Sequence, residues 1–494
     1  MADRAKTLSD LGLTALDGRD GRITGLSVDS RTVQPGHLFA ALPGSQVHGG
    51  EFIQYALRMG AGAVLTDRMG AQIAAKELAK ADIPVVLTED PRQALAFAAA
   101  LWFETQPDTM VAITGTNGKT SVANFTRQIW TLLGLPSVNL GTTGVEGAWQ
   151  APLAHTTPEP ITLHRMLAEI AHRDIDHAAM EASSHGLEQQ RLDGVRIKAG
   201  AFTNLSQDHL DYHADFDDYF DAKAGLFSRV VKDNGTAIVN LDDPRGHQMA
   251  DVAMDRGLRL ITVGHGAEAN LRIRAQRYDA TGQEVRFDWN GHARQVRLDL
   301  IGGFQAENVL TAAGLVIASG CDPTRTFDVL QELTGVPGRM QLAASRDNGG
   351  SVFVDYSHTP EALRTALRAL RPHVLGRLVV VFGAGGDRDP FKRPMMGEAA
   401  RENADVVFVT DDNPRSEDPG SIRRAILATC PEATEVPDRA EAILRGVDAL
   451  QPGDALLVAG KGHETGQVVG DDVFPFDDVE QASVAVAALD GRLV

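Results

Sequence analysis

An apolar run that enters a glycine-rich loop constrains the fold of this chain more than any other feature. The run Met110–Thr114 leads into the loop Gly115–Ser121, with the sequence GTNGKTS, and a stretch of helical character follows. A buried strand, a glycine-rich loop and a helix in this order form a compact supersecondary unit that places the loop at the end of the strand. The sequence therefore predicts a strand-loop-helix unit that begins near residue 110.

The residue types of this loop suit phosphate groups. Glycines let backbone N–H groups approach phosphate oxygens, a lysine neutralises charge, and a threonine hydroxyl can reach a magnesium ion. The spacing is not the commonest one, which would need glycine at position 113, where this chain has Ile113. The structural alternative is a glycine-rich turn whose lysine is solvated. The predicted phosphate-binding residues are Gly115, Thr116, Asn117, Gly118, Lys119, Thr120 and Ser121.

The length of 494 residues exceeds one hydrophobic core and predicts about three domains. Breaks near Gln106–Asp108 and Val336–Gly338 give the boundaries 1–107, 108–336 and 337–494. In the first block, the runs Ala63–Leu65 and Pro84–Leu87 have strand character, which indicates a small α/β domain.

The third block repeats one pattern three times, an apolar run followed by a loop of glycine and charged residues. The runs are Leu378–Phe382 before GAGGDRD, Val406–Thr410 before DDNPR, and Ala455–Ala459 before GKGHE. Parallel α/β sheets present ligand-binding groups at the carboxyl ends of their strands. We therefore expect these three loops to converge on one crevice.

Composition excludes several classes of protein. Hydrophobic residues at 43% and charged residues at 23% are ordinary for a globular enzyme, and the net charge of −19 argues against a nucleic-acid partner. Two cysteines, Cys321 and Cys430, offer neither a disulfide framework nor a cysteine metal site, which favours a reducing cytoplasm. The first residues lack the apolar core of a signal peptide. The longest apolar run, Ala94–Phe103, is about half of the ~20 residues that a membrane span needs, so we expect a buried helix and no membrane insertion.

From Val28–Arg31 through TGTNGKT to Gly460–Glu464, the motifs of essentially the whole chain resemble those of the Mur ligases. A folylpolyglutamate synthase shares the central chemistry but is not expected to carry the DNPR and UDP-sugar loops. The resemblance implies a UDP-precursor-binding domain, a central P-loop ATPase domain and a Rossmann-like C-terminal domain that binds an amino acid. It also implies a bacterial cytoplasmic enzyme, which we expect to be a monomer. Such an enzyme uses ATP and Mg²⁺ to add meso-diaminopimelate to UDP-N-acetylmuramoyl-L-alanyl-D-glutamate through an acyl phosphate.

Residues of the second block are candidates for magnesium binding. Glu181 and His209 offer oxygen and nitrogen ligands, although each can equally be a surface residue. Lys223 falls on the aromatic side of a predicted helix with Phe220 and Phe227, where poor solvation lowers the pKa of its amine. A neutral amine can capture carbon dioxide as a carbamate, whereas a lysine that extends to solvent stays an ammonium. The resemblance favours the carbamate and implies catalytic roles for Lys119, Glu181, His209 and Lys223, with Thr120 as a further metal ligand.

The resemblance assigns the remaining nucleotide and precursor contacts. Asn308, Arg339 and Asp355 match residues on the adenine, phosphates and ribose of ATP, while a helix start, a salt bridge and a strand-end turn are their structural alternatives. The precursor residues are small hydroxyls with one arginine, types that also cap helices. They are Val28, Ser30, Ser45, Gln46, Val47, Thr156, Thr157, Ser183, Gln189 and Arg191. His155 is a departure, because related members carry asparagine there.

The DNPR loop predicts which amino acid is added. A guanidinium at Arg415 can hold the distal carboxylate of diaminopimelate with two hydrogen bonds, and Glu464 can pair with the distal ammonium. Lysine would place a like charge at Arg415. The alternative is a simple turn at Asn413–Pro414. The predicted amino-acid residues are Arg388, Asp412, Asn413, Pro414, Arg415, Gly460 and Glu464. A lysine-adding ligase and a non-catalytic nucleotide-binding regulator remain the rival functions.

Overall fold

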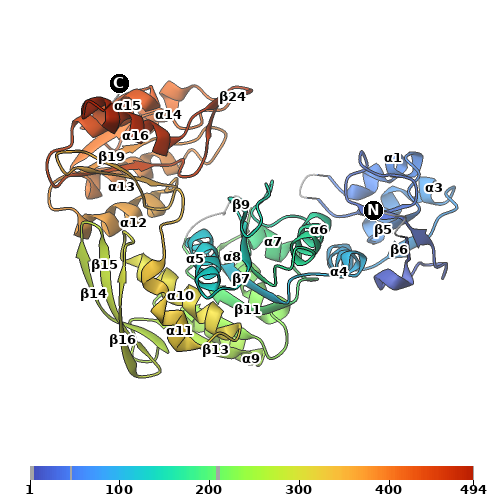
Figure 1. Cartoon of the computed structure of the whole chain (residues 1–494). Helices are drawn as coiled ribbons and strands as arrows, with labels where there is room; N and C mark the ends of the chain where they lie inside the picture. Colours follow the sequence, from blue (N-terminus) through green and yellow to red (C-terminus); the bar gives the residue numbers. More distant parts are fainter. Residues whose placement is uncertain (1–4, 45–46, 207–211, 493–494) are drawn as a thin grey trace.

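Three main sheets follow one another along the chain, and hydrophobic cores pack against each of them (Figure 1). The computed structural model describes residues 5–44, 47–206 and 212–492. The N-terminal and C-terminal domains lie at opposite ends, with the central domain between them. This arrangement confirms the predicted three-domain α/β fold. In the described part of the chain, no helix has the length and apolar character needed to cross a bilayer.

The first domain is built on four short parallel strands in the order β3-β4-β5-β6. They span Gly25–Ser27, His37–Ala41, Ala63–Thr66 and Val85–Leu87. The two apolar runs that predicted strands here form β5 and β6. A short antiparallel pair, β1 (Lys6–Thr7) and β2 (Arg22–Ile23), precedes this sheet along the chain. The helices are α1 (Ile53–Arg58), α2 (Arg68–Ile73), α3 (Ala75–Leu78) and α4 (Pro91–Phe103).

The central domain contains a ten-stranded sheet in the order β16-β15-β14-β13-β12-β11-β7-β10-β8-β9. The predicted strand is β7 (Thr109–Thr114), which lies between and parallel to β11 (Ile197–Phe202) and β10 (His177–Glu181). The other strands are β8 (Ser137–Gly141), β9 (Gly144–Gly147), β12 (Thr236–Asn240), β13 (Arg259–Gly264), β14 (Leu271–Asp279), β15 (Gly282–Trp289) and β16 (His292–Leu298).

Helices cover both faces of this sheet, as its mostly parallel strands require. One core contains side chains of α5 (Lys119–Leu132), α10 (Phe304–Ala318) and α11 (Pro323–Asp328). The opposite core contains side chains of α6 (Pro160–Ala171), α7 (Ser184–Glu188), α8 (Phe216–Gly225) and α9 (Gly246–Asp255). A turn of π-helix, Leu226–Val230, continues α8.

The C-terminal domain has a six-stranded sheet in the order β17-β18-β22-β19-β20-β21. Its strands are β17 (Gln341–Ser345), β18 (Ser351–Asp355), β19 (Leu378–Phe382), β20 (Val406–Val409), β21 (Thr434–Glu435) and β22 (Ala455–Ala459). The three apolar runs of the repeated pattern are the adjacent parallel strands β22, β19 and β20. Helices α12 (Pro360–Leu370), α13 (Lys392–Asn403) and α14 (Pro419–Leu427) cover one face, and α15 (Arg439–Asp448) and α16 (Asp478–Leu489) cover the other. A hairpin of β23 (Gly466–Val469) and β24 (Asp472–Pro475) follows the GKGHE loop.

The apolar helix α4 is only partly buried, so the expectation of a buried helix was wrong in part. Leu95 and Trp102 belong to the core of the first domain, whereas Phe97 and Leu101 are 48% and 44% exposed. An amphipathic period was hard to see because alanine occupies most of the remaining positions. The helix packs against α6 of the central domain and thereby joins the two domains.

A buried histidine lies at this junction. His164 of α6 is 1% exposed, and a Cβ atom at Gly194 would lie 2.6 Å from its Nε2 and 2.9 Å from the Cβ of Ala100 in α4. Burial, assisted by the charge of Arg196, lowers the pKa of His164 from 6.5 to about 4. The imidazole is therefore neutral in the folded protein at neutral pH.

We predict that His164 makes the protein less stable in mild acid. Between pH 6.5 and 4 the unfolded chain protonates this imidazole and the folded chain does not, so the free energy of unfolding falls as the pH falls. The contribution is about 1 kcal/mol at pH 5.5. Denaturant unfolding of wild type and His164→Gln at pH 7.5 and 5.5 measures it. The variant should lose less stability than wild type over this interval, and equal losses would contradict the prediction.

Candidate active site

The glycine-rich loop Gly115–Ser121, the predicted phosphate loop, connects β7 to α5. Its conformation requires glycine at two positions. Gly115 and Gly118 have φ angles of 144° and 85°, in a region that side chains disfavour. Neighbouring side chains also exclude a Cβ atom, because at Gly115 it would collide with Thr203 and at Gly118 it would lie 2.7 Å from Oδ1 of Asn308. The loop thus brings backbone N–H groups to the N-terminus of α5, as phosphate binding requires.

Hydroxyl and carboxylate groups meet beside the start of α5. The hydroxyl of Thr120 donates to Oε1 of Glu181 over 3.0 Å, and the backbone N–H of Thr142 donates to the same oxygen over 2.8 Å. Glu181 is the last residue of β10, and its side chain is buried. The structure therefore brings two of the predicted metal ligands together. His209, a third, lies outside the described residues.

Lys223 lies under the phosphate loop and not at the surface. Its side chain is 1% exposed, its Nζ donates to the carbonyl oxygen of Gly115 over 2.8 Å, and Nζ lies 4.4 Å from the ring centroid of Tyr219. Phe220 and Phe227 are buried on the same side of α8 and its π-helical extension. The alternative of a lysine that extends to solvent is thus wrong, and the aromatic spacing predicted this burial.

A cavity of about 550 Å³ lies between the central and C-terminal domains. Lys119 borders it from the phosphate loop, where its Nζ donates to the carbonyl oxygens of Gly115 and Thr116 over 3.0 and 2.8 Å. Arg339 borders it from the segment that enters the C-terminal domain, and its Nη2 donates to the hydroxyl of Thr120 over 3.5 Å. Two cations from different domains therefore face one cavity.

The other predicted ATP residues line the same cavity. Asn308 lies in the second turn of α10 and donates to Gln305 over 3.2 Å, so it is not a helix-start residue. Asp355 ends β18, accepts from the backbone N–H of Met340 over 2.8 Å and also accepts from the hydroxyl of Ser357. Its structural role as a strand-end turn and its place in the cavity therefore coexist.

Tyr356 is a wall residue that the sequence analysis did not identify. The guanidinium carbon of Arg339 lies 4.4 Å from the Tyr356 ring centroid, and the ring of His463 lies 5.3 Å from it on the GKGHE side. Burial raises the pKa of the Tyr356 hydroxyl. Its position directly after the last residue of an apolar strand was the available signal, since such positions border ligand sites in parallel sheets.

The predicted precursor residues of the central domain form a group next to Glu181. Thr157 donates to the Glu181 carbonyl oxygen over 2.9 Å and accepts from the N–H of Ser183 over 3.0 Å. Arg191 donates to the carbonyl oxygen of Thr157 over 2.6 Å and to Gln189 over 2.7 Å. The hydroxyls of Thr156 and Thr142 are 3.1 Å apart. His155, the departure from the family pattern, is exposed.

The first-domain residues stand apart from this group. Val28 and Val47 are exposed and Ser30 is half-buried, and none of the three lines the described cavity. Ser45 and Gln46 lie outside the described residues. A ligand that contacts both groups must therefore extend beyond the cavity toward the N-terminal domain.

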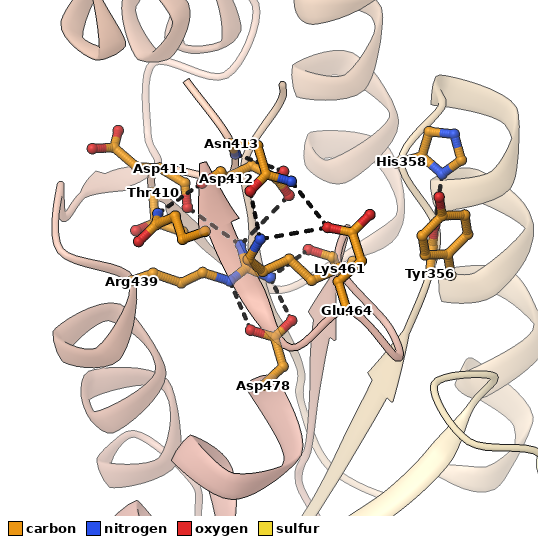
Figure 2. A network of polar contacts seen from close by, with 12 residues as sticks. Tyr356, His358, Thr410, Asp411, Asp412, Asn413, Arg439, Lys461, Glu464 and Asp478 are labelled. Atoms are coloured by element: carbon orange, nitrogen blue, oxygen red, sulfur yellow. Dashed lines mark hydrogen bonds and ion pairs between the residues drawn. The ribbon is translucent and has the colours of Figure 1, made fainter. Parts of the chain in front are cut away.

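The three loops of the C-terminal sheet meet at its carboxyl edge, and Figure 2 shows the contacts between the DNPR and GKGHE loops. Asn413 donates from Nδ2 to Oε2 of Glu464 over 2.9 Å, which links the DNPR and GKGHE loops. Arg415 donates from Nη1 to the carbonyl oxygen of Gly386 over 2.8 Å, which links DNPR to the GAGGDRD loop. Pro414 packs so closely that a Cβ atom at Gly386 would collide with its carbonyl oxygen. The predicted convergence is confirmed, while Arg388 is exposed at the rim.

A buried ion pair supports this edge from below. Arg439, at the start of α15, donates from Nε and Nη2 to the two carboxylate oxygens of Asp478, at the start of α16, over 2.7 and 2.6 Å. Both side chains are fully buried. Nη2 also donates to the carbonyl oxygen of Ala459 over 3.0 Å, and Nη1 lies 4.0 Å from Oδ2 of Asp412. The pair thereby fastens the ends of β20 and β22, and Figure 2 shows it beneath Asn413.

Gly460 requires glycine at this edge. Its φ angle is 120°, and an added Cβ atom would lie 2.5 Å from Oδ2 of Asp412. Its backbone N–H donates to the carbonyl oxygen of Asp355 over 3.1 Å, which joins the GKGHE loop to the neighbouring β18. The end of β18, which borders the cavity, and the GKGHE loop are therefore joined by a backbone hydrogen bond.

Known proteins resemble this chain over nearly its full length. Residues 22–102, 113–316 and 338–462 match, in this order, the Mur ligase family catalytic domain, the Mur ligase middle domain and the Mur ligase glutamate ligase domain. The chain is 49% identical to a UDP-N-acetylmuramoyl-L-alanyl-D-glutamate–2,6-diaminopimelate ligase of Bradyrhizobium diazoefficiens, covering 94% of this chain and 95% of that protein. It is 48% identical to the enzyme of the same name from Brucella melitensis, covering 94% of each. A solved structure of a ligase with this name superimposes with a TM-score of 0.71 at 33% identity, covering 98% of this chain and 99% of the other.

We predict that Asp478→Asn destabilises the C-terminal domain. The substitution leaves the charge of Arg439 buried without its partner, which typically costs about 3–5 kcal/mol. Denaturant unfolding would measure this loss. Asp472→Asn, at an exposed position in β24, is the matched control and should change stability by less than about 0.5 kcal/mol. Equal stabilities of the two variants would refute the supporting role of the pair.

Proposed function

The chain belongs to the Mur ligase family, and on that premise we propose that it is an ATP-dependent ligase that joins meso-diaminopimelate to UDP-N-acetylmuramoyl-L-alanyl-D-glutamate. One observation carries the proposal. The glycine-rich loop and the residues at the end of β18 border a common interdomain cavity, and Arg339 and Tyr356 in its wall connect that loop to His463 of the GKGHE loop. We place the reaction in a bacterial cytoplasm and propose that a monomer performs it.

The chain's residues divide the binding of ATP between two domains. Lys119 and Arg339 hold the phosphates, with the backbone N–H groups of the glycine-rich loop. Asn308 and Asp355 border the same cavity as these cations, and we assign the adenine to Asn308 and the ribose to Asp355 because the two residues match those of the Mur ligases. Since the chain as a whole is strongly acidic, these local cations are needed to attract an anionic substrate.

The cluster beside α5 fits a magnesium ion. The Thr120 hydroxyl and the Glu181 carboxylate are hard oxygen donors within 3.0 Å of each other, and magnesium prefers such ligands. The burial of Lys223 under the phosphate loop is compatible with its proposed form as a carbamate, which would add an anionic oxygen, and His209 completes the proposed set. When bound, the ion offsets repulsion between the ATP phosphates and the substrate carboxylate.

The two substrates lie on either side of the phosphate loop. Thr156, Thr157, Ser183, Gln189 and Arg191 bind the peptide and diphosphate parts of the precursor. The first domain binds its uridine end through Val28, Ser30, Ser45, Gln46 and Val47. The amino acid binds at the C-terminal edge through Arg388, Asp412, Asn413, Pro414, Arg415, Gly460 and Glu464.

Two steps form the amide bond. The side-chain carboxylate of the D-glutamyl residue attacks the terminal phosphorus of ATP, which yields an acyl phosphate and ADP, while Lys119 and Arg339 stabilise the transferred charge. The amine of diaminopimelate then attacks the acyl carbon and loses a proton, and the tetrahedral intermediate collapses to amide and phosphate. Closure of the central and C-terminal domains over the cavity excludes water, which would otherwise hydrolyse the acyl phosphate.

We predict that Lys119→Ala abolishes most product formation while the fold is retained. The lysine interacts most strongly with phosphate charge during transfer, so its loss should lower kcat/KM by about a hundredfold or more. Phosphate release with ATP, UDP-dipeptide and diaminopimelate measures the effect, and circular dichroism checks the fold. Lys80→Ala, at an exposed position of the first domain, is the control with unchanged rate. Near-normal turnover of Lys119→Ala would contradict the proposed role of this lysine at the phosphates and leave it only its contacts within the loop.

We predict that wild type uses meso-diaminopimelate in preference to lysine and that Arg415→Ala loses most of this activity. Truncating one member of a desolvated charge pair costs about 2–5 kcal/mol, which lowers kcat/KM for diaminopimelate accordingly. A panel of amino acids assayed with ATP and the UDP-dipeptide tests class and specificity together.

Two variants sharpen this experiment. Arg415→Lys retains the charge but not the planar pair of donors, so it should fall between wild type and Arg415→Ala. Arg424→Ala removes an exposed ion pair with Asp418 on α14 and should leave the preference intact. A wild type that prefers lysine would favour the lysine-adding form, and no amino-acid-dependent phosphate release at all would favour a nucleotide-binding regulator.

A further inference from the structure

Lys461 is a buried cation in the GKGHE loop whose role is not explained by the nucleotide or precursor sites. Its side chain is 0% exposed. The ammonium donates to Oδ1 of Asn413 over 2.8 Å and to the carbonyl oxygen of Gly466 over 2.7 Å, and it lies 3.5 Å from Oε2 of Glu464. Three acceptors thus surround three N–H donors, which is the condition under which a lysine can remain charged in the interior.

The ammonium determines the orientation of a neighbouring amide. Lysine has donors and no acceptor, so the atom of Asn413 that faces Lys461 must be the carbonyl oxygen. The backbone N–H of Val468 donates to the same oxygen over 2.9 Å, which requires the same orientation. The amide nitrogen of Asn413 is therefore directed at Oε2 of Glu464 (Figure 2).

The position of Glu464 follows from these contacts. Both Asn413 and Lys461 contact Oε2, whereas the side chain of Glu464 is 34% exposed, so its other oxygen can face a ligand. Lys461 also balances the charge of Glu464 next to Asp412, which reduces the negative potential that a substrate carboxylate would meet here.

We propose that Lys461 is a positioning residue for the amino-acid substrate, which holds Asn413 and Glu464 in the arrangement that accepts a distal ammonium beside a distal carboxylate. This inference rests on the proposed ligase function. Without the lysine the Asn413 amide is no longer held in one orientation, and Glu464 gains freedom and uncompensated charge. A substrate with a carboxylate at this end then suffers more than one that carries an ammonium alone.

The test is a steady-state comparison of wild type and Lys461→Met, which has a similar length and no charge. We expect the KM for diaminopimelate to rise about tenfold or more, the size of one lost charge-assisted hydrogen bond, while the KM values for ATP and the UDP-dipeptide stay within about twofold. The ratio of diaminopimelate to lysine use should fall. Arg346→Met, which removes a largely buried cation paired with Asp490 elsewhere in this domain, is the matched control for general destabilisation.

A double variant separates positioning from a general loss of structure. If Lys461 acts through Glu464, Lys461→Met should raise the KM for diaminopimelate much less in a Glu464→Gln background than in wild type. Equal effects in the two backgrounds, or an unchanged KM in Lys461→Met, would overturn the inference.

Asn413→Asp tests the same arrangement should Lys461→Met fail to fold. It retains an oxygen toward Lys461 but replaces the donor to Glu464 by an acceptor, so the KM for diaminopimelate should rise again, and an unchanged KM would contradict the proposal. A wild type without diaminopimelate-dependent phosphate release would overturn the proposed function itself, whereas an active wild type with unaffected variants would overturn only the role of Lys461.

Discussion

In the two larger sheets, neighbouring parallel strands end at the same edge and continue there into polar loops. The interdomain site depends on this shared strand direction. β7 and β10 deliver the glycine-rich loop and Glu181 in the central domain, while β18, β19, β20 and β22 deliver the loops of the C-terminal domain. Close packing of the loops then requires glycine where side chains approach, as at Gly115 and Gly460. The direction of the strands therefore determines where the candidate site residues lie, and glycines provide the space in which the loops pack closely.

Arg339 and Tyr356 connect the glycine-rich loop with the GKGHE loop through a series of contacts. Arg339 contacts Thr120 of the glycine-rich loop and lies over the Tyr356 ring, and the ring of His463 in the GKGHE loop also neighbours Tyr356. These contacts form a continuous connection between the loop that we propose to bind phosphate and the loop that we propose to border the amino acid. Under the proposed function, this continuity offers a physical route by which ATP binding would organise the site for the incoming amine.

Sequence patterns predicted the parts of the structure that local chemistry determines. Short stretches of sequence predicted three such parts. They are the strand-loop-helix unit around Lys119, the three strand ends of the last domain and the buried side of the helix at Lys223. The metal, substrate and boundary assignments remain proposals. What the sequence did not reveal are partnerships between distant residues, because no local pattern pairs Arg439 with Asp478 or directs Lys461 toward Asn413. The alanine-rich α4 was misjudged for a related reason, since the residues at its exposed positions, Phe97 and Leu101, are themselves apolar.

The central domain lies between the two outer domains, with the described cavity at one junction and the contact of α4 with α6 at the other (Figure 1). A ligand that contacts both the first-domain residues and the group beside Glu181 must be long enough to extend from the first domain into the central domain. Short carboxylates can present the same reacting group but leave the far domain without a contact. Under the proposed function, substrate length would then be selected as well as the reacting group, and binding energy from contacts far from the reacting carboxylate would help to orient that carboxylate for phosphorylation.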